Sequence, residues 1–146
     1  MPSPPLRRPL TANGWISSTR EPNRPVYDVI VVGGLNTDFF ADAQKLPAAG
    51  QTLQAGVFLQ SAGGKAANQA VAAARLGARV ALVGRVGDDD RGRQLLAHLD
   101  AERVDVSRVQ RTPGSVTGAA VIHVAYDGNK QILAVLGANL QLTPAE

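Results

Sequence analysis

The chain contains no cysteine, which excludes disulfides and thiolate metal sites, so the fold must rely on the packing of apolar side chains. Aromatic residues make up only 4% of the 146 residues, which leaves few platforms on which nucleic-acid bases could stack. No apolar run is long enough to cross a bilayer, and the first residues lack the apolar core of a secretory signal. These absences predict a cytoplasmic protein that binds neither nucleic acid nor membrane.

The net charge of +3 comes from one segment of the chain. Residues 1–25 hold four arginines and one acidic residue, whereas residues 26–146 carry eleven basic and eleven acidic residues. The opening segment is rich in Pro, Arg and Ser, which is typical of a disordered tail or, as an alternative, of an organelle transit peptide. We therefore expect a disordered tail over 1–25 and one folded unit without a basic surface over 26–146.

Strand and helix patterns alternate through the first part of that unit, which predicts an α/β fold. The β-branched runs at 26–33 and 79–84 are typical of strands buried on both faces of a parallel sheet. Between them, the alanine-rich segment 65–76 predicts a helix that Gly77 ends. A second, amphipathic helix is expected to run to about Arg103, with Asp88 to Asp90 as charges at its N-terminus and not as metal ligands.

The pattern changes in two other segments. Residues 52–60 alternate loosely between polar and apolar side chains, which predicts an exposed strand in a peripheral flap. Residues 116–124 and 130–136 predict two strands, joined by a hairpin at Asp127-Gly128-Asn129. The last four residues, Thr143 to Glu146, have the sequence of a helix start with no helix after it. We expect the chain to be cut from a longer architecture.

Polar side chains accompany two glycine clusters. Asn36 and Asp38 follow a glycine pair at the carboxyl end of the first strand, where we expect a turn, and Lys65 and Asn68 open the first helix after Gly63-Gly64. Ligands of open α/β sheets bind outside the carboxyl ends of the strands, so the clusters can converge there. Carboxylate, amide and ammonium together suit a ligand with many hydroxyl groups. Alternatively, Asp38 simply ends a strand, and Lys65 and Asn68 form a solvated helix start.

Other interpretations of the glycines fail on spacing. A phosphate-binding Walker A loop would need glycine at Leu59 and Ser or Thr at Ala66. A dinucleotide-binding fingerprint would need glycine at Leu35. His98 and His123 have no partner at ligand spacing, so we expect no metal site.

Residues 64–78, GKAANQAVAAARLGA, resemble the N-terminal signature of the ribokinase branch of the PfkB carbohydrate kinases. Further segments are similar to that family in the same order. They are residues 36–38, Leu46-Pro47 with Gly50, residues 86–89 with Gly92, residues 117–120 and Gly137-Ala138-Asn139. The resemblance covers about residues 26–146. It implies a ribokinase-like fold, a Rossmann-like sandwich with a small β lid, truncated to its N-terminal half.

The resemblance also implies an ATP-dependent kinase that phosphorylates D-ribose at the 5-hydroxyl. The sugar would be bound by Asn36, Asp38, Gly64, Lys65 and Asn68, and Thr37, Ala66 and Ala67 would line the pocket through their backbone. Family members carry the catalytic aspartate and the sites for ATP, Mg²⁺ and a monovalent cation in a later segment that does not occur here. The chain would therefore hold no catalytic residue and be inactive alone.

Ala66 stands where ribokinases usually have glycine, which leaves another sugar or a nucleoside open as the substrate. The alternative to an enzyme is a noncatalytic module that binds sugar or dimerises. The missing catalytic half and the two-stranded hairpin at 116–136 favour a homodimer through the β lid.

Overall fold

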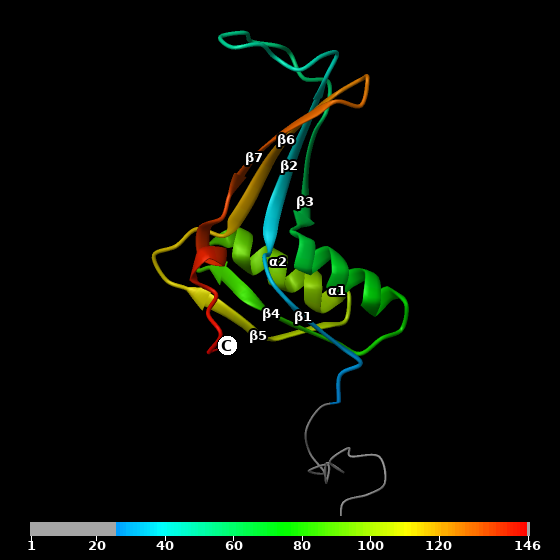
Figure 1. The fold of residues 1–146 in the computed structure, drawn as a ribbon, viewed down its shortest axis with the longest axis vertical. Helices are drawn as coiled ribbons and strands as arrows, with labels where there is room; N and C mark the ends of the chain where they lie inside the picture. The colour runs from blue at the N-terminus through cyan, green and yellow to red at the C-terminus, as the bar shows by residue number, and fades with distance from the viewer. Residues whose placement is uncertain (1–25, 146) are drawn as a thin grey trace, which may run out of the picture.

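The fold has two parts, a small α/β layer and a four-stranded sheet that projects from it (Figure 1). The structure is a computed structural model and describes residues 26–145. The tail expected at 1–25 and the last residue, Glu146, lie outside the described residues.

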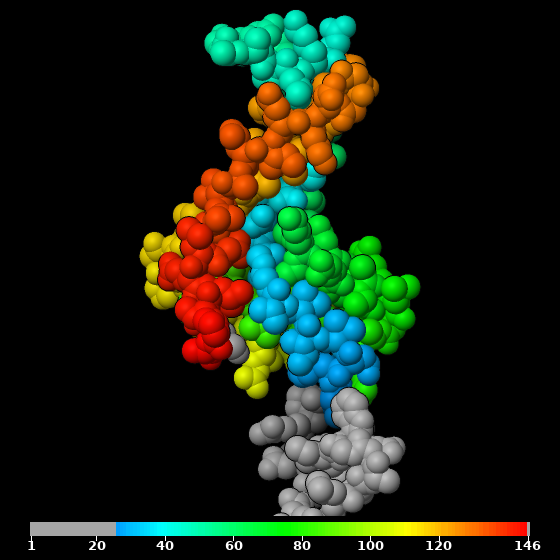
Figure 2. Space-filling view, in the orientation of Figure 1, coloured from blue at the N-terminus to red at the C-terminus, as the bar shows by residue number. Residues whose placement is uncertain are grey.

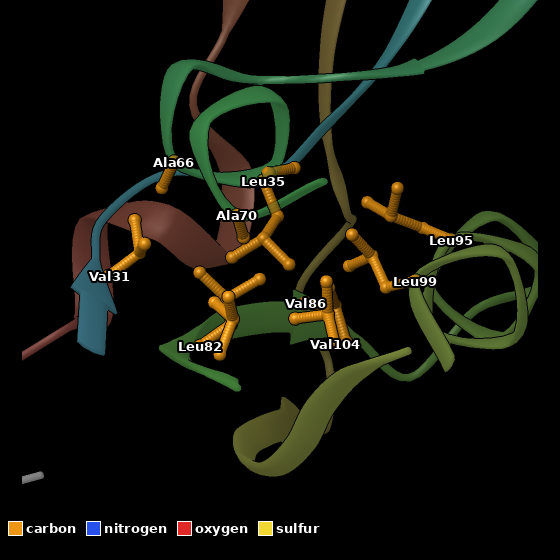
Figure 3. Packing of buried hydrophobic residues seen from close by; sticks show 11 residues of the cluster. Val31, Leu35, Ala66, Ala70, Leu82, Val86, Leu95, Leu99 and Val104 are labelled. Atoms are coloured by element: carbon orange, nitrogen blue, oxygen red, sulfur yellow. The ribbon is translucent and has the colours of Figure 1, made fainter. Parts of the chain in front are cut away.

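The α/β layer is a three-stranded parallel sheet in the order β1-β4-β5. Its strands are β1 (Val29–Val32), β4 (Val80–Gly87) and β5 (Val104–Thr112), and its helices are α1 (Lys65–Arg75) and α2 (Asp90–Ala101). Both helices pack on the same face, because both contribute to one cluster of buried side chains (Figure 3). Leu35, Leu82 and Leu99 are fully buried at its centre. The core therefore lies between the helices and one face of this sheet.

Local signals explain where the two helices begin and end. Gly64 is the N-cap of α1, and Gly77 follows its C-terminus with φ +92°, a conformation that glycine adopts without strain. The Asp89 carboxylate caps α2 by accepting a hydrogen bond from the Gly92 amide at 2.8 Å. Both predicted helices are confirmed, and Asp89 acts as the helix-terminal charge that the sequence indicated.

The projecting part, here called the lid sheet, has the strand order β3-β2-β6-β7. Its strands are β2 (Asn36–Ala43), β3 (Phe58–Gly63), β6 (Gly118–Ala125) and β7 (Lys130–Val135). β2 and β6 are parallel, and the two outer pairs are antiparallel. The predicted hairpin of β6 and β7 is confirmed, and a short 3₁₀ helix, η1 (Gly137–Gln141), leads back to the α/β layer. The chain thus enters the lid sheet twice, at Asn36 and at Gly118, and returns to the layer after Gly63 and again at Gly137.

Several expectations about strands were wrong. Residues 36–38 do not form a turn but begin the eight-residue strand β2, so Asp38 does not end a strand. The flap strand starts at Phe58 rather than at residue 52, and β5 was not foreseen.

β1 also differs from the expected strand with two buried faces. Ile30 is 62% exposed and Val32 is 63% exposed. The reason is that β1 pairs with β4 alone and so forms an edge of the sheet, while α1 covers only the face that carries Val31. Among residues 26–145, no helix is both long and apolar enough to cross a membrane.

Candidate functional site

The site is built where β2 leaves the α/β layer. Strand pairing sets Asn36 opposite Gly63 of β3 and opposite Gly118 of β6. Because side chains alternate along a strand, Asn36 and Asp38 share one face of the lid sheet, roughly 7 Å apart along the strand. An amide and a carboxylate therefore stand side by side at the base of the lid sheet.

The two glycines bring the start of α1 against these side chains. Gly64 has φ +92°, and a Cβ atom there would lie 2.5 Å from the carbonyl oxygen of Gly34. A Cβ atom on Gly63 would overlap the carboxylate of Asp38. Only glycine at both positions lets the carboxylate and the helix N-terminus approach each other, and the partial positive charge of that terminus favours an anion.

Asp38 is the polar group that the fold leaves unsatisfied. Its Oδ1 atom is buried, and among the described residues it is the one buried side-chain oxygen or nitrogen without a hydrogen-bond partner. Burial raises the pKa of the Asp38 carboxyl above its ordinary value, because removal from water disfavours the charged form. Such a group is expected to accept a hydrogen bond from a ligand.

Asn36 is held by a residue far along the chain. Its Oδ1 atom accepts a hydrogen bond from the Asn139 side-chain amide at 3.0 Å. Asn139 lies on η1 and also bonds the backbone of Leu35, as donor to the carbonyl at 3.0 Å and as acceptor from the amide at 2.9 Å. Sequence reasoning did not assign a role to Asn139, although it singled out the segment Gly137-Ala138-Asn139.

The remaining predicted site residues surround the first turn of α1. Lys65, its first residue, is exposed, while Ala66 and Ala67 are buried against the core. Asn68 is exposed and borders a hollow of ≈290 Å³ between the two helices, together with His98. The structure thus groups Asn36, Asp38 and Gly64 at one point, and it sets Asn68 against α2.

Thr37 is buried and lies on the opposite face of the lid sheet from Asn36 and Asp38. It borders a hollow of ≈390 Å³ that also involves Arg91 and His98 of α2. This position leaves its backbone, and not its side chain, available on the side of the candidate site.

Asp89 is fully engaged in holding the base of the lid sheet. Thr117, which is fully buried just before β6, donates to the Asp89 carboxylate from its hydroxyl at 2.6 Å and from its amide at 2.9 Å. Burial alone would raise the pKa of Asp89. The bonds from Thr117 and Gly92, with the charge of Arg91, outweigh this effect and lower the pKa to about 2. No group of three or more His, Asp or Glu side chains in residues 26–145 could hold a metal ion.

Fold and site together define an α/β protein in which the base of a projecting sheet presents an amide and a carboxylate beside the glycine-preceded start of a helix. The sequence profile of the pfkB family carbohydrate kinases matches residues 27–146. The chain belongs to this family. It is 42% identical over 118 residues to a ribokinase of Bacillus subtilis, a match that covers 81% of this chain and 40% of that relative.

Solved structures agree with this assignment. A ribokinase structure from Giardia lamblia matches with a TM-score of 0.77 and 32% identity over 82% of this chain and 37% of that one. The ribokinase of Arabidopsis thaliana complexed with ribose and ATP matches with a TM-score of 0.67 and 37% identity, over 75% of this chain and 36% of that one. These likenesses support the expected ribokinase-like fold. The chain spans about 40% of the length of these relatives.

Proposed function

We propose that this chain is the sugar-binding part of an ATP-dependent kinase that phosphorylates D-ribose at its 5-hydroxyl. The family and the similarity to ribokinases support the reaction class. The observation that carries the proposal is the buried Oδ1 atom of Asp38, which has no partner and lies beside Asn36. A ligand hydroxyl group would satisfy it.

The chemistry of the proposed site fits a sugar. The Asp38 carboxylate accepts hydrogen bonds from hydroxyl groups, and the Asn36 amide donates to their oxygens. We also assign the Lys65 ammonium and the Asn68 amide, both in the first turn of α1, as donors to the sugar, which requires the sugar to reach the hollow that Asn68 borders. Gly64 would give the sugar access to the backbone, and Thr37, Ala66 and Ala67 would border it through theirs. An amide and a carboxylate on one strand face, roughly 7 Å apart, can contact different hydroxyl groups of one sugar.

Among the described residues, no group of three or more His, Asp or Glu side chains could hold a metal ion. The resemblance implies that the catalytic aspartate and the sites for ATP, Mg²⁺ and a monovalent cation lie in a later segment of family members. Phosphoryl transfer depends on stabilising the charge that spreads over the phosphate oxygens. We therefore propose that other residues supply these sites, that this part binds and orients the sugar, and that it is inactive alone.

Titration of the 146-residue chain with D-ribose tests the proposal. Ribose should raise the melting temperature, because a ligand that binds only the folded state stabilises it. Asp38→Ala should abolish the rise, whereas Asp100→Ala, at an exposed position on α2, should keep it. ADP release from a mixture with ribose and MgATP should stay at background. A wild-type chain that no pentose stabilises would refute sugar binding, and ribose-dependent turnover would refute inactivity.

The second candidate function is self-association through the lid sheet. Its outer strands β3 and β7 each have an edge without a neighbouring strand among the described residues. Phe58 is 68% exposed and Leu133 is 71% exposed, and Figure 2 shows the lid sheet as a column that stands away from the rest of the molecule. Unpaired edges and exposed apolar side chains favour pairing between chains. We propose that the chain forms a homodimer through this sheet.

Light scattering tests this association. The wild-type chain should show the mass of a dimer, and Leu133→Glu should shift it to the monomer by placing a charge in the interface. Leu76→Glu is the matched control, because Leu76 is also exposed, at 89%, but lies at the end of α1. A monodisperse wild-type monomer, or equal effects of both variants, would contradict a lid-sheet dimer.

A further inference from the structure

Asn139 makes three hydrogen bonds from one side chain, all to the first residues of the site. Its Oδ1 atom accepts from the Leu35 amide at 2.9 Å. Its Nδ2 atom donates to the Leu35 carbonyl at 3.0 Å and to Asn36 Oδ1 at 3.0 Å. Both hydrogens of the Nδ2 atom are therefore in use.

The backbone of Leu35 decides which way the Asn139 carboxamide points. A backbone amide can only donate and a carbonyl can only accept, so Asn139 must turn its oxygen to the Leu35 N–H and its nitrogen to the Leu35 C=O. The second hydrogen of that nitrogen then points at Asn36, which must offer an oxygen. The donor and acceptor of the Leu35 backbone thus fix the orientation of the Asn139 carboxamide. That orientation in turn fixes which side-chain atom of Asn36 faces Asn139.

Gly118 makes room for this arrangement. A Cβ atom at that position would overlap both Asn139 Nδ2 and Asn36 Oδ1. Gly118 is buried at the start of β6, directly opposite Asn36 in the strand pairing. Strands β2 and β6 and the helix η1 therefore meet around the bond between the two carboxamides.

We propose that Asn139 is a positioning residue that fixes the Asn36 carboxamide with its N–H₂ group toward the ligand. This inference rests on the proposed sugar binding. It adds which hydrogen-bonding groups the site presents to the sugar, namely a donor at Asn36 beside an acceptor at Asp38. Such a pair recognises two hydroxyl groups of one ligand, of which one accepts and the other donates. Asn36 turned the other way would offer an oxygen and set two acceptors side by side.

A first experiment needs no ligand. Hydrogen exchange of side-chain amides in the 146-residue chain, followed by NMR, should be slower for Asn139 than for Asn129, whose side-chain amide bonds Asp127 on an exposed turn. The Asn36 amide should exchange faster than that of Asn139, because its hydrogens face the site. An Asn139 amide that exchanges as fast as that of Asn129 would refute the positioning role of Asn139.

A second experiment measures D-ribose affinity in Asn139→Asp. The carboxylate still accepts from the Leu35 amide but has no hydrogen to donate, so the Asn36 carboxamide should turn to donate to it. We expect affinity to fall tenfold or more, while Asn129→Asp, the same exchange on the exposed turn, leaves it unchanged. A loss below threefold in folded Asn139→Asp would overturn the proposal.

A double-mutant cycle separates positioning from general loosening of the fold. Asn139→Ala should weaken ribose binding in the wild-type background but not in the Asn36→Ala background, because it acts through Asn36. Equal losses in both backgrounds would show a merely structural role and refute positioning. If the wild-type chain binds no pentose, the proposed function fails, while the exchange experiment still decides whether Asn139 orients Asn36.

Discussion

Asp38→Asn should make the free chain more stable while it weakens sugar binding. The native carboxylate is partly buried, and its Oδ1 atom has no hydrogen-bond partner. A buried polar atom without a partner costs about 1–3 kcal/mol. The amide removes the charge but keeps one unsatisfied polar atom, so we expect a gain at the low end, about 1 kcal/mol. For a folded unit of this size that corresponds to a rise of about 3–6 °C in melting temperature.

The gain should depend on pH. Burial raises the folded-state pKa of Asp38 above its unfolded value, so its carboxyl lowers stability only where the folded chain must hold it ionised. Below the unfolded pKa the carboxyl is protonated in both states and costs nothing. The advantage of Asp38→Asn should therefore be full above the raised pKa and disappear as the pH falls toward the ordinary Asp value.

Thermal unfolding followed by circular dichroism between pH 3 and pH 8 measures this difference. Asp100→Asn serves as the control, because Asp100 is exposed on α2 and the exchange should change stability by less than about 0.5 kcal/mol. D-ribose should stabilise the wild type more than Asp38→Asn. A variant that is less stable than the wild type at pH 7, or a difference that does not vary with pH, would refute the reasoning.

Three further predictions concern stability. Gly64→Ala should lower the free energy of unfolding, measured with denaturant, by about 2–4 kcal/mol, and Gly77→Ala by only about 1 kcal/mol. Both glycines have φ +92°, but only at Gly64 would a Cβ atom lie 2.5 Å from a backbone atom. Equal losses in the two variants would contradict the close approach at Gly64. Asp89→Ala should cost about 2–4 kcal/mol by leaving Thr117 unsatisfied. Because the pKa of Asp89 is lowered to about 2, its ionised carboxylate should stabilise the folded chain by about 1–2 kcal/mol above pH 4. This stabilisation should be lost as the pH falls toward 2. Acid titration of Asp89→Ala should not show this loss. Ala66→Gly should lower the free energy of unfolding by about 1 kcal/mol in denaturant unfolding, because glycine loses more backbone freedom in a helix than alanine does. An unchanged unfolding midpoint would contradict this expectation.

The sequence alone determined the features that depend on a few neighbouring residues. The alanine-rich helix between Gly64 and Gly77, the cap of α2 by Asp89 and the hairpin at Gly128 follow from local steric and hydrogen-bonding preferences. The sequence also predicted Asp38 as a site residue, because a carboxylate after a glycine-ended strand lies where α/β folds bind ligands; the structure shows that its Oδ1 atom is buried without a partner.

Only the tertiary structure decided which segments meet. The pairing of β2 with both β3 and β6 made Asn36–Asp38 a strand, although the local sequence suggested a turn. The same sheet order left β1 at an edge with Ile30 exposed. The Asn139 contact joins residues 103 positions apart in the sequence. Such contacts depend on how sheets and loops pack in three dimensions, and no local preference of the chain encodes them.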